Sequence, residues 1–327
     1  MWNEPATSYR NADEIYDEPT STYRNADKGR DGIMKDVHEV PTTSGRVRLL
    51  DVYEFRQKHG YFSIFVSIVQ TLILIIMMCQ CGVAPIQINP MVGPYPDALS
   101  YWGAKNAVLI LEDGEYWRLL SANMLHAGVI HLIGNVSVQI EMGAFFEREW
   151  GSGVWLIVYL ASALGSSVLS TCALPGMISV GSSGAVMGLF GAKLSEIFCR
   201  ACESRLSVQE KVGHAVRMEQ LSGTVVCIII VMLFSFIPYV DWAAHVGGLL
   251  SGMAIGLTMF SCSIATICWR ILWFIAGLIL TVILFTSLFM YMFNSVEPIE
   301  ALRDVCGYYQ QFFEDYECHC MKGEQNE

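Results

Sequence analysis

Charged residues are scarce in this chain, and they are unevenly placed. Only 16% of its 327 residues are Asp, Glu, Lys or Arg, against about a quarter in soluble globular proteins. Residues 1–58 and the stretch from Glu297 onward are polar and acidic, while almost everything between them is apolar. This pattern excludes a soluble enzyme and a disordered scaffold. The net charge of −11 also excludes nucleic-acid binding, because it would repel a phosphate backbone.

The apolar stretches lack the polar–apolar alternation of a transmembrane β-barrel, and each is long enough to cross a bilayer as a helix. The sequence therefore predicts an all-α fold, a polytopic helical bundle in the lipid bilayer. Seven spans are expected, at roughly 61–81, 127–144, 154–174, 182–199, 223–240, 242–262 and 271–293. The first 40 residues also lack the apolar segment of a cleavable signal peptide, so we expect the first span to act as the targeting signal.

Lysine and arginine near the span ends predict the orientation, because they accumulate on the cytosolic side. Ten lie on one side: Arg46, Arg48, Arg56, Lys58, Arg148, Arg200, Arg205, Lys211, Arg217 and Arg270. Four lie on the other: Lys105, Arg118, Arg303 and Lys322. We therefore expect a cytosolic tail (1–58), a membrane domain (59–296) and an acidic lumenal or extracellular tail (297–327), in a protein of the secretory pathway or plasma membrane.

The N-terminal tail contains a short repeat. The segment Glu4–Asp13 recurs with few changes as Glu18–Asp27, a period of 14 residues. Two copies are too few for a repeat fold, and their composition cannot form a packed core, so the tail is predicted to be disordered. Tyr9, Tyr16 and Tyr23 lie among acidic residues, which leaves open a regulatory segment that is phosphorylated.

Three polar clusters interrupt the apolar spans, at residues 125–135, 180–188 and 244–256. A single His or Ser in a membrane often serves only helix packing, and a polar stripe can line a transport path. A transporter would, however, predict inverted repeats or charged pairs at the midplane, and the sequence shows neither. All three clusters begin even-numbered spans and so share one depth near the outer face. Independent packing residues have no reason to do so, which favours one convergent site.

The clusters contain the residue types needed for serine hydrolysis. A serine hydroxyl is a poor nucleophile until a base removes its proton, and His245 is a candidate base. Small residues would let the fourth and sixth spans approach closely, and Gly181 and Gly184 flank the serine where a loop turns into a helix. The glycines that would form the contact faces are Gly184 and Gly188 in the fourth span, and Gly248, Gly252 and Gly256 in the sixth.

A hydrolase also needs donors for the oxyanion of a tetrahedral intermediate. The backbone N–H of Ser183 is one candidate, because it lies near a helix N-terminus. His131 and Asn135 can supply side-chain donors, since they lie on one face of the second span together with Gln139. Asp241 precedes His245 by four residues and either orients its ring or marks the membrane interface, and we expect the second.

In combination, these motifs resemble the rhomboid family of intramembrane serine proteases over roughly residues 60–295. The order of the motifs and their placement in the spans match as well. They are Trp117-Arg118 in the first outer loop, the His126, His131 and Asn135 pattern, Gly181-x-Ser183-Gly184, and Ala244-His245-x-x-Gly248.

The resemblance implies a role for each motif residue. Ser183, rather than the adjacent Ser182, would be the nucleophile and His245 its base, in a dyad that needs no Asp. His131 and Asn135 would form the oxyanion site. Structural roles are implied for Trp117, Arg118, His126, Gly181, Gly184, Gly248 and Gly252. A seventh span after a six-helix rhomboid core, and the loop segment Asn89–Pro96, resemble the eukaryotic secretase-type members.

The expected function is therefore an intramembrane serine endopeptidase. It would cleave transmembrane or juxtamembrane segments of single-pass membrane proteins through an acyl-enzyme, with no metal or cofactor. The alternative is a catalytically silent relative that binds membrane clients for trafficking or degradation, although the intact Ser183 and His245 favour an enzyme. The sequence does not indicate an oligomeric state.

Cysteines are concentrated near the expected outer side, where an oxidising environment permits disulfides. Six lie there, with the pairing left open: Cys79, Cys81, Cys172, Cys306, Cys318 and Cys320. Cys199 and Cys202 lie at the cytosolic end of the fourth span. We expect buried thiols there, with S-palmitoylation as the alternative.

Overall fold

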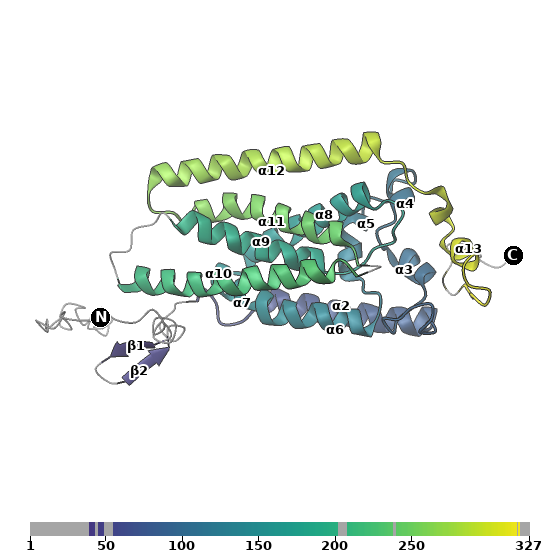
Figure 1. Cartoon of the computed structure of the whole chain (residues 1–327), viewed down its shortest axis with the longest axis horizontal. Helices are drawn as coiled ribbons and strands as arrows, with labels where there is room; N and C mark the ends of the chain where they lie inside the picture. The colour runs from purple at the N-terminus through teal and green to yellow at the C-terminus, as the bar shows by residue number, and fades with distance from the viewer. Residues whose placement is uncertain are drawn as a thin grey trace, which may run out of the picture.

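Long helices lying side by side form the body of the molecule (Figure 1). The computed structural model describes residues 39–42, 45–48, 55–201, 208–237, 240–318 and 320. Within them the long helices are α2 (Tyr61–Cys81), α6 (Val129–Val138) continued by η3 (Gln139–Gly143) and α7 (Ala144–Trp150), α8 (Ser152–Ala173), α9 (Ser183–Ala201), α10 (Val208–Phe234), α11 (Trp242–Ser261) and α12 (Ile267–Ser295). This confirms the predicted helical membrane bundle, and each expected span overlaps one of these helical segments.

Two helical segments extend furthest beyond the predicted spans. The second continues to Trp150 through the π-helical turn η3, and α10 begins at Val208 rather than near residue 223. The added parts contain charged residues such as Glu147, Lys211 and Arg217. A span predicted from hydropathy ends at charged residues, whereas the backbone hydrogen bonds of a helix can continue through them.

The helix α9 differs from its neighbours in composition. Six of the described long segments are apolar enough to cross a membrane by themselves, and α9 is not among them. Its second half contains Lys193 and Glu196, both buried. Lys193 Nζ lies 2.7 Å from Glu149 Oε2 and 2.8 Å from Glu196 Oε2. Charges this far from water need partners, and here they come from α9 itself through Glu196 and from α7 through Glu149.

Backbone contact between α9 and α11 forms the centre of the bundle, and this helix pair packs most extensively. A Cβ atom on Gly248 would lie 1.8 Å from the Gly184 carbonyl oxygen, and one on Gly252 would lie 1.9 Å from that of Gly188. Real Cβ atoms do not approach so closely, so only glycine fits here. The two helices therefore meet through the glycine faces predicted for the fourth and sixth spans.

Short helices fold the outer loop between α2 and α6: α3 (Pro96–Trp102), α4 (Ala107–Leu111), α5 (Arg118–Ser121) and η2 (Ala122–Met124). Arg118 is fully buried in this loop. Its Nη1 donates to the carbonyl oxygens of Ser100 at 2.6 Å and Ala104 at 3.1 Å, and its guanidinium lies 4.8 Å from the Trp117 ring centroid. The Trp117-Arg118 pair thus holds the loop together at a distance from Ser183 and His245.

The C-terminal tail folds back over the outer loop, at the right of Figure 1. It contains η4 (Glu300–Arg303) and α13 (Val305–Gln310). The Tyr316 hydroxyl donates to Asp97 of α3 at 2.6 Å. Disulfides join Cys81 to Cys320 and Cys306 to Cys318, so four of the six candidate cysteines pair. Of the described cysteines on this side, Cys79 and Cys172 form no disulfide.

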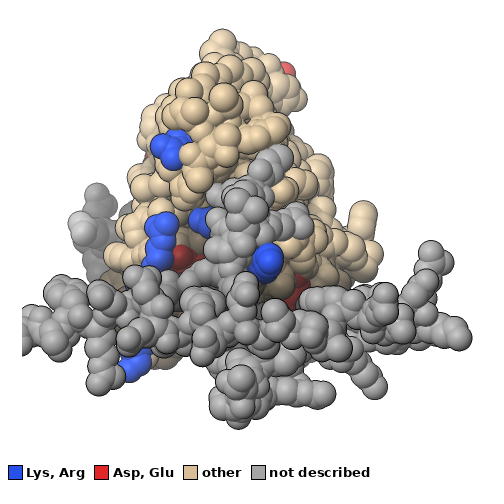
Figure 2. Space-filling model, turned by 90° about the vertical axis from the view of Figure 1, so that its left-hand side faces the viewer, with Lys and Arg blue, Asp and Glu red and all other residues tan. Residues whose placement is uncertain are grey.

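Among the described residues, cationic side chains used to predict the orientation lie at opposite ends of the bundle. Figure 2 shows the end on the left of Figure 1, where blue Lys and Arg side chains lie at the surface. The helix ends that contain Arg148, Arg200 and Arg270 are found there, whereas Lys105, Arg118 and Arg303 belong to the outer loop and tail.

The N-terminal tail is described only in part. The strands β1 (Glu39–Thr42) and β2 (Gly45–Arg48) form an antiparallel pair. The 14-residue repeat, its three tyrosines and Cys202 lie outside the described residues, so disorder and modification there stay predictions. Cys199 is fully buried, as an ordinary interior thiol would be.

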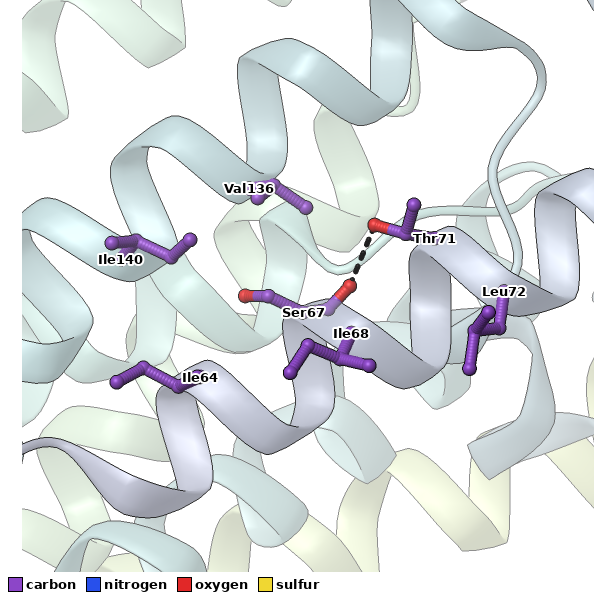
Figure 3. A pocket seen from close by; sticks show the side chains of 7 residues that line it. All are labelled: Ile64, Ser67, Ile68, Thr71, Leu72, Val136 and Ile140. Atoms are coloured by element: carbon purple, nitrogen blue, oxygen red, sulfur yellow. Dashed lines mark hydrogen bonds between the residues drawn. The ribbon is translucent and has the colours of Figure 1, made fainter.

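A shallow apolar groove runs between α2 and the second span (Figure 3). Of its two polar side chains, Thr71 donates through Oγ1 to the Ser67 carbonyl oxygen of its own helix at 2.8 Å, and Ser67 accepts through Oγ from Gln139. Ile68 and Leu72 are each about half exposed, at 53% and 51%. The lining residues are Ile64, Ser67, Ile68, Thr71, Leu72, Val136 and Ile140. None of them belongs to the three polar clusters, and this surface suits contact with lipid.

Candidate active site

Ser183 and His245 form a direct hydrogen bond. Ser183 is the first residue of α9, and His245 lies in the first turn of α11. The distance from His245 Nε2 to Ser183 Oγ is 2.7 Å. The glycine contact between the two helices begins immediately below this pair, because Gly184 and Gly248 touch. The packing of the helices therefore sets the distance between hydroxyl and imidazole.

The adjacent Ser182 faces another histidine. Ser182 is fully buried, and its Oγ lies 3.5 Å from His126 Nε2. His126 is also fully buried, just before α6, and its ring packs edge-on against His131 with the centroids 5.3 Å apart. Burial lowers the pKa of His126 to about 3, so its imidazole is neutral near pH 7. These contacts make Ser182 and His126 part of the support for the loop before α9.

His131 and Asn135 reach the same site from α6. A Cβ atom on Gly181 would lie 2.9 Å from His131 Nε2 and 3.5 Å from Asn135 Nδ2. The His131 Nδ1 accepts the Ala127 N–H at 3.4 Å, so its Nε2 is the nitrogen left to donate. In the described part of the chain, Asn135 Nδ2 is buried without a hydrogen-bond partner. His131 and Asn135 thus offer two side-chain donors next to the backbone of Gly181, which precedes Ser183 by two residues.

Gly181 makes this approach possible in two ways. Its φ is +128°, a conformation that residues with a side chain rarely adopt. It also has no Cβ atom, which would collide with the His131 ring. The loop can therefore turn sharply into α9 while the α6 side chains lie against its backbone.

The polar stripe of the second span divides at the π-helical turn. Gln139, the first residue of η3, points to α2 and α8 instead of the site. Its Nε2 donates to Ser67 Oγ at 2.8 Å and to Gln70 Oε1 at 3.2 Å, while its Oε1 accepts from Tyr159 at 3.0 Å. His131 and Asn135 therefore lie at the site, whereas Gln139, expected on the same helix face, belongs to a buried polar network.

Asp241 caps α11 and does not contact the imidazole of His245. One carboxylate oxygen accepts the Ala244 N–H at 2.8 Å. The other accepts hydrogen bonds from the hydroxyls of Ser170 and Ser179. Asp241 thus ties together the start of α11, the end of α8 and the loop before α9. The printed contacts of the Asp241 side chain are therefore with the α11 backbone and two serines rather than with the His245 ring, and its expected place at the membrane interface stays a prediction.

Two residues with a place at the site were not singled out from the sequence. The first is Ser235, whose Oγ lies 2.6 Å from His245 Nδ1. The only sequence feature that could have indicated Ser235 is weak, because it is a single serine within the fifth apolar stretch. The second is Lys105, which counted only as a charge on the outer side. Its backbone pairs with Ser179 in an isolated bridge.

The Lys105 side chain holds the loop that leads to Ser183. Its Nζ donates to the carbonyl oxygens of Leu174 at 2.8 Å and Met177 at 2.6 Å. Burial lowers the pKa of Lys105 to about 8, although the charge of Asp241 acts in the opposite direction. The loop is therefore fixed by the outer loop on one side and by Asp241 on the other.

The assembled groups have the composition of an acyl-transfer site. A hydroxyl lies in hydrogen-bond contact with an imidazole, and donors stand next to it where an oxyanion would form. Across the ranges that the structure describes, no three His, Cys, Asp or Glu side chains lie close enough to hold a metal ion.

Comparison with known proteins agrees with these features. Residues 113–262 match the family model of the Rhomboid domain. RHOMBOID-like protein 6, mitochondrial, of Arabidopsis thaliana is 36% identical over 177 residues, which cover 54% of each chain. Rhomboid-like protease 2 of Toxoplasma gondii is 30% identical, over 59% of this chain and 64% of that protein.

The third relative is bacterial. The Rhomboid protease GluP of Bacillus subtilis is 35% identical over 48% of this chain and 28% of its own. The chain spans about half the length of the Arabidopsis relatives it matches, between 41% and 54%. The Rhomboid domain match over residues 113–262, these relatives and the bundle of apolar helices identify this chain as an integral membrane protein with a region similar to the Rhomboid domain.

Proposed function

We propose that the protein is an intramembrane serine endopeptidase. The observation that carries this proposal is the 2.7 Å contact between Ser183 Oγ and His245 Nε2. Two of the relatives are named as proteases, and a relative that had lost catalysis would not need to keep this pair together. The four groups named for the site, Ser183, His245, His131 and Asn135, supply the whole of the chemistry without a metal or cofactor.

The reaction begins with attack of Ser183 Oγ on the scissile carbonyl carbon, while His245 Nε2 takes the hydroxyl proton. The Nδ2 of Asn135, the Nε2 of His131 and the Ser183 backbone N–H stabilise the oxyanion of the tetrahedral intermediate. His245 then gives the proton to the leaving amine as the peptide C–N bond breaks. A water molecule, activated by the same imidazole, hydrolyses the acyl-enzyme and restores Ser183.

Membrane proteins are the substrates that suit such a site. It lies at one end of a bundle whose helices are long and apolar, so a peptide must reach it from the bilayer or its surface. A substrate helix hides its peptide bonds in backbone hydrogen bonds. Single-pass proteins with small or helix-destabilising residues near the membrane surface are therefore the expected substrates.

The orientation is part of the proposal. With more lysine and arginine at the opposite end, the site and the C-terminal tail face the lumen or the cell exterior. The disulfides of Cys81 with Cys320 and Cys306 with Cys318 support this, because disulfides persist on the oxidising side of secretory membranes. The secretory pathway or plasma membrane follows as the location.

Cleavage of a model single-pass substrate by the purified protein in liposomes tests the proposal. Ser183→Ala and His245→Ala should each reduce cleavage by about 10⁴-fold or more, as the loss of a nucleophile or its base does in serine proteases. Ser222→Ala is the matched control, since this exposed α10 serine contacts only its own helix. Undiminished cleavage in both site variants would refute the mechanism.

A fluorophosphonate probe distinguishes the proposed enzyme from the alternative, a catalytically silent relative that binds membrane clients. Only a serine with an engaged base reacts quickly with such a probe. Labelling of the wild-type protein but not of Ser183→Ala supports the enzyme. Client binding without labelling would support the alternative.

A further inference from the structure

A serine outside the recognised motifs contacts the second nitrogen of His245. Ser235 follows directly after α10, and its Oγ lies 2.6 Å from His245 Nδ1. Both residues are only 5% exposed, so water does not compete for this contact. On the other side of the ring, Nε2 lies 2.7 Å from Ser183 Oγ. The imidazole is therefore held at both nitrogens.

The hydrogen bonds of Ser235 decide which nitrogen of the ring carries the proton. A serine hydroxyl has one proton to donate and two lone pairs that accept. Ser235 Oγ also lies 2.8 Å from the Val231 carbonyl oxygen, which can only accept. With its proton used there, Ser235 offers His245 only a lone pair. The Nδ1 must then be the N–H, because a neutral imidazole has one.

This tautomer is the one that a base at Nε2 requires. With the proton on Nδ1, the lone pair of Nε2 faces Ser183 and can take its hydroxyl proton. The carboxylate nearest along α11, that of Asp241, is already bonded to the Ala244 N–H and to two serine hydroxyls. Ser235 thus occupies the place next to His245 that an acid holds in a three-residue arrangement.

We propose that Ser235 is the positioning residue of His245, a role that rests on the proposed function. When Ser183 attacks, its proton moves to Nε2 and its oxygen electron pair forms the bond to carbon. The Nδ1 proton stays on the ring, and its hydrogen bond to Ser235 Oγ becomes charge-assisted. Such bonds are stronger than neutral ones, so the contact stabilises the transition state more than the resting enzyme.

Kinetics of three variants in liposomes test the energetic part. Ser235→Ala should lower kcat by about 10- to 100-fold with KM within about twofold, as expected for a hydrogen bond to a charged group. Ser235→Thr retains the hydroxyl and should recover most of kcat. Ser222→Ala, within α10 and exposed, should equal the wild type. If Ser235→Ala matches Ser222→Ala, the proposal is wrong.

The tautomer can be measured without proteolysis and without a variant at Ser235. In protein labelled with ¹⁵N-histidine, with the His245 signals assigned by their loss in His245→Gln, Nδ1 should show the shift of a protonated nitrogen and Nε2 that of an unprotonated one. The reverse pattern would overturn the proposal even if Ser183→Ala is inactive. Cleavage that survives Ser183→Ala would instead remove the proposed function, while the spectrum still decides the role of Ser235.

Discussion

Ser183 and His245 are 62 residues apart in the chain, yet their side chains meet at 2.7 Å. Asn135, from a third helix, adds a buried amide nitrogen that has no hydrogen-bond partner in the described structure. Burying a polar group without a hydrogen bond costs stability. An unpaired donor near the Ser183 hydroxyl is therefore consistent with an acceptor that is present only during a reaction. A tetrahedral oxyanion is such an acceptor.

Asn135→Ala tests this donor. We expect kcat to fall by about 10²- to 10³-fold with little change in KM, as for the loss of one oxyanion-hole donor. The reason is that the amide would bond the oxyanion more strongly than the ground-state carbonyl. Asn294→Ala, at an exposed asparagine on α12, is the control. A loss seen mainly in KM would assign Asn135 to substrate binding instead.

Lys105 gives a pH-dependent prediction at the same scale. Its pKa is about 8 in the folded protein, against an ordinary value of 10.5. Between these values the unfolded chain binds a proton that the folded protein has lost, so stability rises with pH. Relative to Lys105→Met, the unfolding free energy of the wild type should increase by up to about 1.4 kcal/mol per pH unit from pH 8 to 10.5.

The measurement is reversible unfolding of the two proteins in mixed micelles across that pH range. Lys58→Met, at an exposed lysine, serves as control and should follow the wild-type slope. A parallel course of wild type and Lys105→Met would show that Lys105 keeps its proton inside the fold.

At the scale of elements, the contact of α9 with α11 decides whether the site exists. Both helices are rich in glycine, and their backbones touch where Gly252 meets Gly188. Hydropathy does not describe this contact, since α9 alone is not apolar enough to count as a span. Its buried charges at Lys193 and Glu196 pair with each other, and Lys193 also pairs with Glu149 of α7.

Gly252→Ala should therefore separate the two helices. The new Cβ would lie 1.9 Å from the Gly188 carbonyl oxygen, and such overpacking costs about 1–3 kcal/mol of stability. Because Ser183 and His245 are carried by these helices, a shift of about 1 Å should lower kcat by about 10²-fold.

Gly134→Ala is the matched control, because nothing lies within 4 Å of a Cβ on this α6 glycine. Its melting temperature and activity should equal or exceed those of the wild type. Equal activity in Gly252→Ala and Gly134→Ala would contradict the role given to the α9–α11 contact.

At the scale of the whole molecule, the C-terminal tail is fastened to the end of the first span. The Cys81–Cys320 disulfide spans 239 residues of sequence, and Tyr316 and Asp97 add a hydrogen bond. The tail therefore covers α3 as part of the folded structure. Its disulfides also make the predicted orientation testable, because they form only on an oxidising side.

Cys320→Ser should release this attachment. The expected loss is about 2–4 kcal/mol of unfolding free energy, because a disulfide restricts the unfolded chain. Unfolding in mixed micelles, with and without reductant, measures it. Cys79→Ser is the control, since Cys79 is exposed and forms no disulfide. A reductant effect that persists unchanged in Cys320→Ser would contradict the Cys81–Cys320 pairing.

Much of the fold and part of the site could be predicted from the sequence. The span positions follow from runs of apolar residues, and α2 and α11 lie within one residue of the predicted bounds. The convergence of the polar clusters follows from their matched depth, which is a property of spacing, and the resemblance to rhomboids selects Ser183 over Ser182 as the partner of His245. These signals are local, so a single chain reveals them.

The tertiary structure decided what depends on distances between remote residues. It placed Asp241 on Ser170 and Ser179 rather than on His245, and it put Ser235 at the imidazole instead. It turned Gln139 away from the site and chose the disulfide partners. A side chain's spacing along its helix predicts only its face, whereas its partner is set by the packing of other helices. The sequence by itself thus determined the spans, the family resemblance and the candidate residues, and only their packing decided which nitrogen faces the nucleophile.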